Sequence, residues 1–387
     1  MSVKIVVTGD NHLNFFSQKF GSKLEQRRAT IGRAWRETVD FAIDHGVDLY
    51  LNVGDMFDQV TPRNPPRCRV VEAFVDLNEA GVKSFIIAGT HDSPATMIEG
   101  SSPHGILQEA GLATVFEDTT TFGHELIEVD GKKISVAGIS TDKRLHPDMD
   151  PLKDLIIPAG GDFNIAMLHY STERIAPPYW EEPQIRLSSL DANKHINLFV
   201  LGHIHQHIKE KVGDSLILYP GATERVDFGE AGKETGFCYL EIDGRKIDVE
   251  FIKTHSQPMS RETIHASRIP SENPTRFILD TVSKNGNPEE LMQLVLEGEL
   301  DFKEYMKIDF SRIYDEGRRL NFFFEYLDRM RPLAEDLSFE PSEGLHPRNE
   351  LVAMARRYVD NADPEDRASW ERAMELAISY YDRFWEA

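Results

Sequence analysis

The amino-acid sequence predicts a layered α/β domain of two packed sheets flanked by helices, followed by a smaller mixed segment and a helical tail. Short β-rich runs alternate with amphipathic helical stretches over roughly the first 250 residues. Hydrophobic residues make up 40% and charged residues 28% of the 387, as in an ordinary folded protein. The periodicity is lost near Thr254 and again over residues 339–347. At roughly 100–200 residues per domain, this length accommodates two or three domains.

The layered domain begins with an alternation of strand and helix. A strand is predicted at 3–7, and a helix at 26–45 has apolar residues spaced three and four apart. A strand at 47–53, a helix at 66–79 and a strand at 83–88 complete this part. Further strands, with fewer helices between them, are predicted at 164–169, 196–201, 215–219, 236–242 and 248–253. This order is typical of a layered α/β domain.

The two breaks in periodicity divide the chain into three predicted domains. Residues 1–258 form the layered domain, 259–338 a small α+β domain, and 339–387 a helical tail. In the tail, Asp363 and Pro364 are the residue types that begin a helix. The helix after them has one apolar face, made of Trp370, Met374, Ala377, Ile378, Tyr381 and Phe384.

Composition excludes several classes of protein. The two cysteines, Cys68 and Cys238, are too few for a disulfide scaffold or a cysteine-rich zinc site. No apolar run approaches the length of a membrane span and the N-terminus lacks the layout of a signal peptide, so we expect a cytoplasmic protein. The 43 basic and 65 acidic residues give a formal charge of −22, which argues against coating nucleic acid through a basic face. Local contact with phosphates through metal ions is compatible with this charge.

Five short motifs carry side chains suited to metal binding or catalysis, and four of them close a predicted strand. They are Asp10-Asn11-His12, Gly54-Asp55-Met56-Phe57-Asp58, Gly89-Thr90-His91-Asp92, Leu168-His169-Tyr170 and Gly202-His203-Ile204-His205. Loops at the carboxyl ends of strands gather the active sites of α/β folds. The glycines before the acidic and histidine residues permit tight turns. Each motif alone is common by chance, and their combination in this order indicates one site. His104, His195 and His207 fall outside the pattern and are predicted to be surface or structural residues.

The motifs supply six oxygen and nitrogen donors and no thiolate: Asp10, His12, Asp55, His169, His203 and His205. Such a set suits manganese or iron better than a structural zinc ion. Asp55 has two carboxylate oxygens and could bridge two ions, and a pair of ions about 4 Å apart promotes in-line displacement at phosphorus. His91 is then a candidate acid for the leaving oxygen, oriented by Asp92.

The five motifs resemble those of the calcineurin-like metallophosphoesterases, and the chain most resembles the SbcD-type DNA repair nucleases of that superfamily. The finer resemblance rests on Gly54-Asp55-Met56-Phe57-Asp58 with Pro62 and Pro65, on Tyr219-Pro220-Gly221-Ala222-Thr223-Glu224-Arg225, on Asp227-Phe228 and on Gln257-Pro258. It covers about residues 1–260, and the rest only in layout. It implies a four-layer αββα sandwich with a dinuclear centre, a small α+β capping domain and a C-terminal helical tail.

The resemblance implies two ligand sets: Asp10, His12, Asp55 and His205 for a first ion, and Asp55, His169 and His203 for a second. It makes His91 the residue that protonates the leaving sugar oxygen, with Asp92 as its neighbour. The family places an asparagine ligand of the second ion where this chain has Thr90. Because a hydroxyl is a shorter and weaker neutral ligand than an amide carbonyl, we expect weaker binding of the second ion.

The activity implied by the resemblance is that of a manganese-dependent DNA exonuclease and endonuclease in double-strand break repair. Its cofactors would be two Mn²⁺ ions, with Fe²⁺ or Mg²⁺ as alternatives. Its partners would be DNA ends, an SbcC-type SMC-like ATPase held by the tail, and a second copy of the chain in a homodimer. Basic residues near the first two motifs are candidates for DNA-phosphate contacts, or else belong to solvated helix faces. They are Lys23, Arg27, Arg28, Arg33 and Arg36, then Arg63, Arg67 and Arg69.

Two other functions stay open. One is a phosphodiesterase acting on small nucleotides or other phosphoesters, which the charge of −22 favours and the long C-terminal extension disfavours. The other is a weakly active scaffold that binds DNA ends and is detuned at Thr90. Two metal ions per chain would support catalysis, and one or none would support the scaffold.

Overall fold

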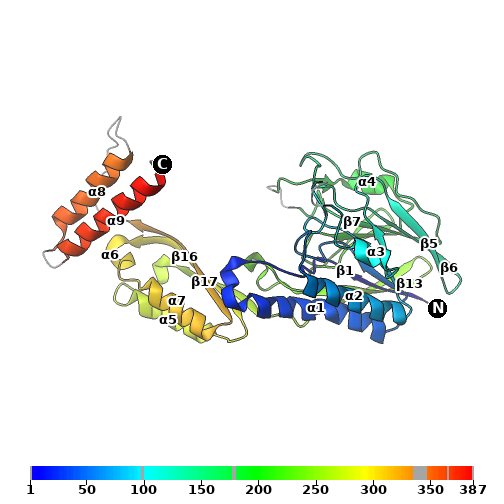
Figure 1. The fold of residues 1–387 in the computed structure, drawn as a ribbon, viewed down its shortest axis with the longest axis horizontal. Helices are drawn as coiled ribbons and strands as arrows, with labels where there is room; N and C mark the ends of the chain where they lie inside the picture. Colours follow the sequence, from blue (N-terminus) through cyan, green and yellow to red (C-terminus); the bar gives the residue numbers. More distant parts are fainter. Residues whose placement is uncertain (1, 97–99, 177–179, 334–346, 364–365, 386–387) are drawn as a thin grey trace. The chain divides into compact units, whose positions relative to one another are not determined.

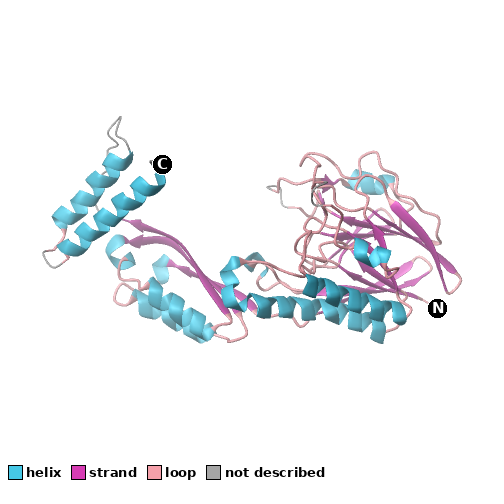
Figure 2. Cartoon of the chain, viewed as in Figure 1, coloured by secondary structure: helices cyan, strands magenta, loops and turns pink. Residues whose placement is uncertain are grey.

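Two six-stranded sheets stack face to face, and the apolar side chains between them form the central core of the protein (Figures 1 and 2). The computed structural model describes residues 2–96, 100–176, 180–333, 347–363 and 366–385. The chain divides into two compact units, Met1–Arg331 and Pro332–Ala387. The first sheet has the order β14 (Lys246–Lys253), β13 (Gly236–Asp243), β1 (Val3–Thr8), β2 (Leu49–Asn52), β3 (Lys83–Ile87), β4 (Thr114–Phe116). The second has the order β11 (Ile208–Val212), β12 (Ser215–Tyr219), β10 (Leu198–Gly202), β7 (Phe163–His169), β6 (Lys132–Gly138), β5 (Gly123–Val129).

Strand β1 shows how both faces of a central strand are covered. Ile5 and Val7 point into the core between the sheets, whereas Val6 packs among the helices outside. Val7 pairs with Leu51 of β2 in parallel and with Cys238 of β13 in antiparallel register. A parallel strand with apolar residues on both faces is expected where layers cover both sides of a sheet.

Helices form the outer layer on the first sheet. They are α1 (Leu24–Asp44), α2 (Asn64–Glu79) and the short α3 (Gly105–Glu109). Ile31 and Trp35 of α1 pack with Phe74 of α2 against the sheet. The outer face of the second sheet is covered by α4 (Leu187–Ala192) and by irregular segments. The αββα prediction is confirmed, and the fourth layer contains little helix among the residues that the structure describes.

Most of the predicted strands and helices are present within a few residues of their expected bounds, but β4, β5, β6 and β11 are not among the predicted elements. β5 and β6 form a hairpin whose turn, Asp130-Gly131, has φ values of 47° and 75°. Asp-Gly with positive φ at both positions is a strong hairpin indication, so the sequence did contain a sign of this pair. The charged residues on its exposed face obscure the apolar alternation.

A smaller sheet with its own core follows the sandwich. It contains β15 (Met259–His265), β16 (Leu291–Asp301) and β17 (Phe323–Leu333), with α5 (Pro274–Asn285), α6 (Phe302–Tyr305) and α7 (Phe310–Leu320). Ile278, Leu294 and Phe324 are buried in that core. This α+β arrangement contacts the sandwich through Phe20, whose ring stacks on Phe323 with centroids 4.5 Å apart.

The second unit contains two helices that pack together, α8 (Pro347–Asn361) and α9 (Arg367–Trp385). Tyr358 of α8 stacks on Trp370 of α9 with ring centroids 5.2 Å apart. The predicted boundary at 338/339, the proline of the predicted helix start and the side chain of Phe384 lie outside the described residues. Of the rest of the predicted apolar face, Ala377 is exposed, and the half-buried members are Trp370, Met374, Ile378 and Tyr381. Among the helices that the structure describes, none is long and apolar enough to cross a membrane.

A buried ion pair joins α1 to the segment between β12 and β13, and both of its members bind Gln257 in the segment that leaves the sandwich. The guanidinium of Arg27 lies 3.3 Å from the carboxylate of Glu224, and both residues are 1% exposed. Arg27 also donates to Gln257 Oε1 at 2.9 Å, and the backbone N–H of Gln257 donates to Glu224 Oε2 at 2.8 Å. Glu224 and Gln257, two of the residues on which the finer family resemblance rests, therefore have a structural role in holding α1.

Removing the charge of Glu224 is expected to destabilise the protein strongly. Glu224→Gln keeps the shape but leaves the Arg27 charge buried without its counter-ion, which costs about 3–5 kcal/mol. Urea unfolding followed by circular dichroism would measure this loss. Asp248→Asn, which breaks the exposed pair with Lys246, is the matched control and should change stability little. Equal effects of the two substitutions would contradict a structural role for the buried pair.

Candidate metal centre

The five motifs converge where the parallel strands of both sheets end. Asp10 and His12 follow β1, Asp55 follows β2, and the motif with Thr90 and His91 follows β3. His169 ends β7, and His203 and His205 follow β10. β1, β2 and β3 belong to one sheet and β7 and β10 to the other. The site therefore lies at the shared edge of the sandwich, as the positions of the motifs predict.

Five of the six predicted donors form two groups that share Asp10. One group contains Asp10, His12 and His205, the other Asp10, Asp55 and His169, and the ligand atoms of each lie within 4.8 Å of one another. His12 Nε2 is 3.1 Å from His205 Nε2, and His169 Nε2 is 3.2 Å from Asp55 Oδ2. Asp10 Oδ1 lies 3.9 Å from the Nε2 atoms of both His169 and His205. The shared carboxylate is thus Asp10, and the bridging role of Asp55 stays a prediction.

The second ring nitrogen of each histidine in these groups is held by a neighbour. His12 Nδ1 lies 3.2 Å from Asp58 Oδ1, and His205 Nδ1 contacts the carboxylate of Glu230. His169 Nδ1 donates to the carbonyl of Val53 at 2.7 Å. Such outer partners orient a ligating imidazole and leave its Nε2 facing the ion.

His203 is placed differently from the other histidines. Its backbone N–H donates to Asp10 Oδ1 at 3.0 Å, and its ring centroid is 5.5 Å from that of His169. Its Nε2 lies 2.8 Å from Glu182 Oε2, so Nδ1 is the nitrogen left for a metal. The side chain belongs to neither group of three donors, and its role as a ligand stays a prediction.

Four of the predicted ligands have strained backbones. Asp10, His12, Asp55 and His203 have φ values of 50°, 48°, 51° and 85°, in the left-handed region that side chains other than glycine disfavour. Hydrogen bonds between loops compensate for this: the Asp10 amide donates to the Gly54 carbonyl and the His12 amide to the Asp55 carbonyl, both at 3.0 Å. Backbone strain of this kind concentrates at functional sites.

The glycines of the motifs are required for close packing more than for turns. A Cβ on Gly54 or Gly202 would lie 2.6 or 2.4 Å from His169 Nδ1, and one on Gly89 would lie 2.3 Å from Asp55 Oδ1. Of these three, Gly54 alone has a positive φ, of 96°. The prediction of a tight turn therefore holds at Gly54, and at Gly89 and Gly202 it is corrected: there the backbone has to approach the candidate ligand side chains with no Cβ between.

His91 lies beside the centre, but its predicted partner is elsewhere. Its ring meets that of His12 edge-on with centroids 4.8 Å apart, and its side chain is 48% exposed. Asp92 does not orient it: this carboxylate is fully buried, pairs with His104 Nε2 at 2.9 Å and accepts from the amides of Phe57 and Gly89. His91 Nδ1 instead donates to the carbonyl of Asp58 at 3.2 Å. Asp92 has a structural role, as does His104, which the sequence pattern leaves as a structural or surface residue.

Thr90 lines two cavities beside the centre. One, of about 320 Å³, also contains His169, His203 and Tyr170 in its wall. The other, of about 450 Å³, contains His91 and Asp58. Lys143 lines both, which makes it a positive residue beside the centre that the sequence did not indicate.

The three arginines predicted to contact DNA have different surroundings. Arg27 is buried in the ion pair with Glu224, so it has no surface for a phosphate; this prediction is corrected. Arg28 is largely buried and donates to the Phe15 carbonyl at 2.6 Å. Arg63 is 48% exposed and lies 3.0 Å from Glu25.

The donor set fits a divalent cation. Asp10 Oδ2 is buried and has no hydrogen-bond partner among the described residues, and the buried His169 Nε2 lies 3.2 Å from the carboxylate of Asp55. Burial opposes the charged form of His169, but the carboxylates of Asp55 and Asp10 outweigh it and raise its pKa to about 10. Burial likewise opposes the charge of His205, while Glu230 and Asp10 raise its pKa to about 9. The site thus favours positive charge, and metal ions bound by oxygen and imidazole donors would supply it.

The outer partners Asp58, Glu182 and Glu230 are not among the predicted site residues. Asp58 closes the second motif, so its position was visible in the sequence. Glu182 lies in the segment between β8 (Ser171–Thr172) and β9 (Gln184–Ile185), and Glu230 ends a short 3-10 helix, Phe228–Glu230. No spacing relates these two acids to the histidines that they orient, so only the folded chain identifies them.

Adding one methyl group at Gly89 is expected to disrupt the centre. In Gly89→Ala the new Cβ clashes with Asp55 Oδ1 and with the ring of His169, so both stability and bound metal should fall. Thermal melting and elemental analysis of the purified protein would measure these losses. Gly160→Ala is the control, because its Cβ would lie an ordinary 3.5 Å from Leu126 Cδ1. Normal metal content in Gly89→Ala would contradict the close packing described above.

Metal affinity is expected to rise with pH. The raised pKa values of His169 and His205 mean that both rings are protonated at pH 7 in the metal-free chain, and an ion has to displace these protons. Affinity should therefore increase from about pH 6 to pH 9, with release of about two protons per chain at pH 7. Calorimetry in two buffers of different ionisation enthalpy gives the proton count. Binding without proton release would be inconsistent with these histidines as ligands.

Comparison with known proteins agrees with this site. Residues 3–207, more than half of the chain, match the family model of the calcineurin-like phosphoesterases. The DNA double-strand break repair protein Mre11 of Methanocaldococcus jannaschii is 26% identical over 63% of this chain and 64% of its own length. The protein of the same name from Saccharolobus solfataricus is 26% identical over 81% of each chain. The uncharacterized metallophosphoesterase YhaO of Bacillus subtilis is 25% identical over 68% of this chain and 63% of its own length.

The chain spans just under two thirds of the length of the first of these relatives. Among solved structures, a dimetal phosphatase from Danio rerio is similar with a TM-score of 0.38 and 11% identity, covering 65% of this chain and 99% of that one. The five motifs, from Asp10 to His205, all lie within the residues that match the family model. The chain belongs to the calcineurin-like phosphoesterase family.

Proposed function

We propose that this chain is a DNA nuclease that hydrolyses phosphodiester bonds with two divalent metal ions, Mn²⁺ being the preferred one. The observation that carries the proposal is the cluster of two aspartates and three histidines at the shared sheet edge, with exposed His91 beside it. Phosphoester hydrolysis follows from the family. DNA as the substrate is supported by the relatives named as DNA double-strand break repair proteins.

The residues of the centre have distinct roles in this proposal. Asp10, His12, Asp55 and His205 would hold one ion, and Asp55, His169 and His203 the other, with Asp55 contributing to both. Bound ions supply Lewis acidity toward a phosphoryl oxygen and a nucleophile at neutral pH. The carboxylates of Asp58 and Glu230 keep the imidazoles of His12 and His205 in one orientation, so little reorganisation is needed when the substrate binds.

In this proposal His91 would deliver a proton to the leaving oxygen. Because Nδ1 donates to the Asp58 carbonyl, Nε2 is the nitrogen left for the leaving oxygen, and His91 lines a cavity together with Thr90. The edge-on contact with His12 keeps the ring close to the metal ligands. A half-exposed imidazole can also exchange its proton with solvent between turnovers.

Replacing His91 should abolish most cleavage without loss of metal. In His91→Ala, cleavage of end-labelled duplex and single-stranded DNA in manganese should slow about 10²–10⁴-fold, the usual contribution of a general acid. His146→Ala, which removes an exposed histidine elsewhere, is the matched control and should leave the rate unchanged. Undiminished cleavage by His91→Ala would remove this residue from the mechanism.

Restoring the amide at Thr90 should strengthen the second metal site. A carbonyl oxygen reaches further than a hydroxyl, so Thr90→Asn should bind the second ion more tightly and reach full activity at lower manganese concentration. Manganese titrations of metal content and of DNA cleavage measure the two effects. Identical titrations for Thr90→Asn and the natural chain would mean that residue 90 does not contact the ion.

A phosphodiesterase of small substrates is the second candidate function. The cavity of about 320 Å³ beside His169 and His203 has apolar walls at Leu145 and Pro183 and is within the size range of small-ligand sites. Hydrolysis of bis(p-nitrophenyl) phosphate or a cyclic dinucleotide without cleavage of DNA would favour this candidate. If the chain cleaved neither substrate and bound one ion or none, the result would favour the DNA-end-binding scaffold.

An SMC-like ATPase bound through the tail, and a homodimer, complete the proposal. Part of the apolar face of α9 packs within the helix pair, since Trp370 stacks on Tyr358. Leu376 of α9 is 54% and Met354 of α8 42% exposed, which leaves apolar surface for another protein. Unchanged binding to the ATPase after deletion of residues 345–387 would exclude this role of the tail.

A further inference from the structure

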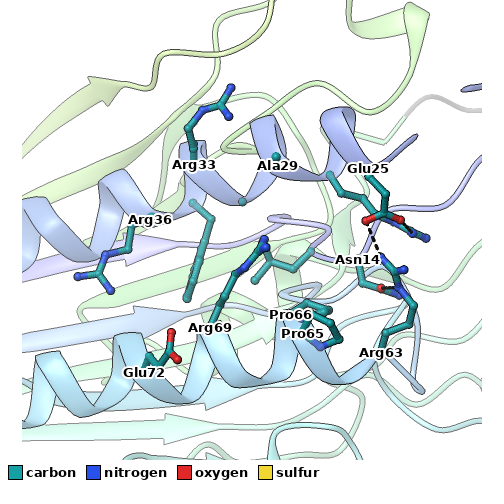
Figure 3. Close-up of a pocket in the computed structure, with 14 residues that line it drawn as sticks. Asn14, Glu25, Ala29, Arg33, Arg36, Arg63, Pro65, Pro66, Arg69 and Glu72 are labelled. Carbon is teal, nitrogen blue, oxygen red and sulfur yellow. Dashed lines mark hydrogen bonds and ion pairs between the residues drawn. The ribbon is translucent and has the colours of Figure 1, made fainter. Parts of the chain in front are cut away.

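A cavity of about 460 Å³ lies between α1 and α2, separate from the metal centre (Figure 3). Its wall contains residues of both helices together with Leu13 and Asn14, which directly follow the first motif. No residue of the predicted ligand set lines it. Its volume lies in the range typical of sites for small molecules.

The wall of the α1/α2 cavity is positively charged in a protein of net charge −22. It contains two glutamates, Glu25 and Glu72, and five arginines, Arg28, Arg33, Arg36, Arg63 and Arg69, of which Arg33 points away from α2 in Figure 3. Of these, Arg36 is paired with Asp40 and Asp76. Such an excess of arginine in a concave site favours an anionic ligand.

Three of the arginines have donors to spare. Arg28 and Arg63 share Glu25, each through a single nitrogen, at 2.7 and 3.0 Å. Arg69 has no ion-pair partner among the described residues, and it extends from α2 toward α1 in Figure 3. Its Nη1 lies 3.9 Å from the position that a Cβ on Gly32 would occupy, so the glycine leaves room for it. The guanidinium fork matches the geometry of a phosphate or carboxylate.

A buried amide nitrogen also lacks a partner among the described residues that line this cavity. Asn14 is 4% exposed, and its Oδ1 accepts from Arg63 Nε at 3.1 Å. Since Arg63 Nε can only donate, this contact fixes the amide orientation and leaves Nδ2 as the second polar atom. Nδ2 is buried without a hydrogen-bond partner among the described residues. An unpaired buried donor costs free energy that an acceptor from a ligand would recover.

The remainder of the wall is apolar. Trp35, Pro65 and Pro66 line the cavity together with Leu13 and Ala29. A tetrahedral dianion alone would leave this surface uncovered. A ligand with a charged group and a flat or apolar body would use both parts of the site.

We propose that the α1/α2 cavity binds a phosphate monoester on a body of nucleoside size, with its phosphate between Asn14, Arg63 and Arg69. A tetrahedral dianion accepts from several donors at once, which suits two guanidinium groups and an amide better than a carboxylate does. Two sources have this chemistry: a free nucleoside monophosphate, or the phosphorylated end of a nucleic acid strand.

Backbone hydrogen bonds connect the wall of the α1/α2 cavity to the loops of the metal centre. The Leu13 amide donates to the Met56 carbonyl at 2.8 Å and the Asp58 amide to the Leu13 carbonyl at 2.9 Å. Asn14 is two residues from His12, and Asp58 orients His12. Occupation of the cavity would therefore restrain the loop that carries two of the metal ligands.

Calorimetric titration of the full chain with adenosine monophosphate, in the presence of a chelator, tests the proposal. The chelator keeps the nucleotide from binding through metal ions, so the result does not depend on whether the chain is a nuclease. We expect one nucleotide per chain, and binding at least tenfold weaker for adenosine, which lacks the phosphate. Arg69→Ala should weaken binding about tenfold, the usual effect of losing a charged hydrogen bond.

Asn14→Asp is the sharpest variant. Aspartate has the shape of asparagine, keeps an oxygen that accepts from Arg63, and adopts the positive φ of 67° at this position about as readily. It replaces the unpaired Nδ2 donor with a negatively charged oxygen. It should abolish binding of the nucleotide while the melting temperature stays close to that of the natural chain. Arg245→Ala, which removes an exposed arginine of the β13–β14 hairpin, is the matched control and should not affect binding.

Competition with trinucleotides identifies the source of the phosphate. Displacement of the nucleotide by a 5′-phosphorylated trinucleotide, and not by its unphosphorylated form, would identify a nucleic acid end. Failure of both to displace it would identify the free nucleotide. The proposal is overturned if adenosine monophosphate does not bind, or if Asn14→Asp and Arg69→Ala bind it as well as Arg245→Ala does.

Discussion

The hydrogen bond from His169 to the carbonyl of Val53 connects the two sheets at the edge where the chemistry is located. His169 ends β7 of the second sheet, and Val53 follows β2 of the first. The ring is fully buried and has backbone around it at positions where Gly54, Gly89 and Gly202 leave no Cβ. Because the imidazole is fixed from both sheets, Asp10 and Asp55 of the first sheet can lie within ligand distance of its Nε2.

This arrangement concentrates opposing charges in a small volume. Buried carboxylates and imidazoles are stable when they are paired or when they coordinate a cation. The outer acids Asp58, Glu182 and Glu230 add negative charge around the centre, so the site favours metal ions even before a substrate is present. The charge of the centre therefore depends on its metal content.

The basic residues near the first two motifs have different structural surroundings although they are close in sequence. Arg27 neutralises Glu224 and holds the joint between the sandwich and the following domain. Arg63 and Arg69 line a cavity together with Asn14, whose Nδ2 has no hydrogen-bond partner among the described residues. The spacing of the arginines in the sequence does not distinguish the buried one from those at the cavity. The direction of each side chain depends on which face of α1 or α2 meets a neighbour.

The sequence by itself predicted the alternation of strands and helices, the positions of the motifs at strand ends and the set of candidate metal donors. These features are local, because a run of apolar residues followed by Asp10 or His169 is readable without knowledge of its neighbours. The tertiary structure decided which groups meet: that Asp10 is shared by both groups of donors, that Asp92 pairs with His104 and not with His91, and that Glu182 and Glu230 orient histidines. Each of these contacts joins segments that are distant in sequence or that follow irregular loops. Their positions depend on packing between whole layers, and no local pattern of residues encodes that packing.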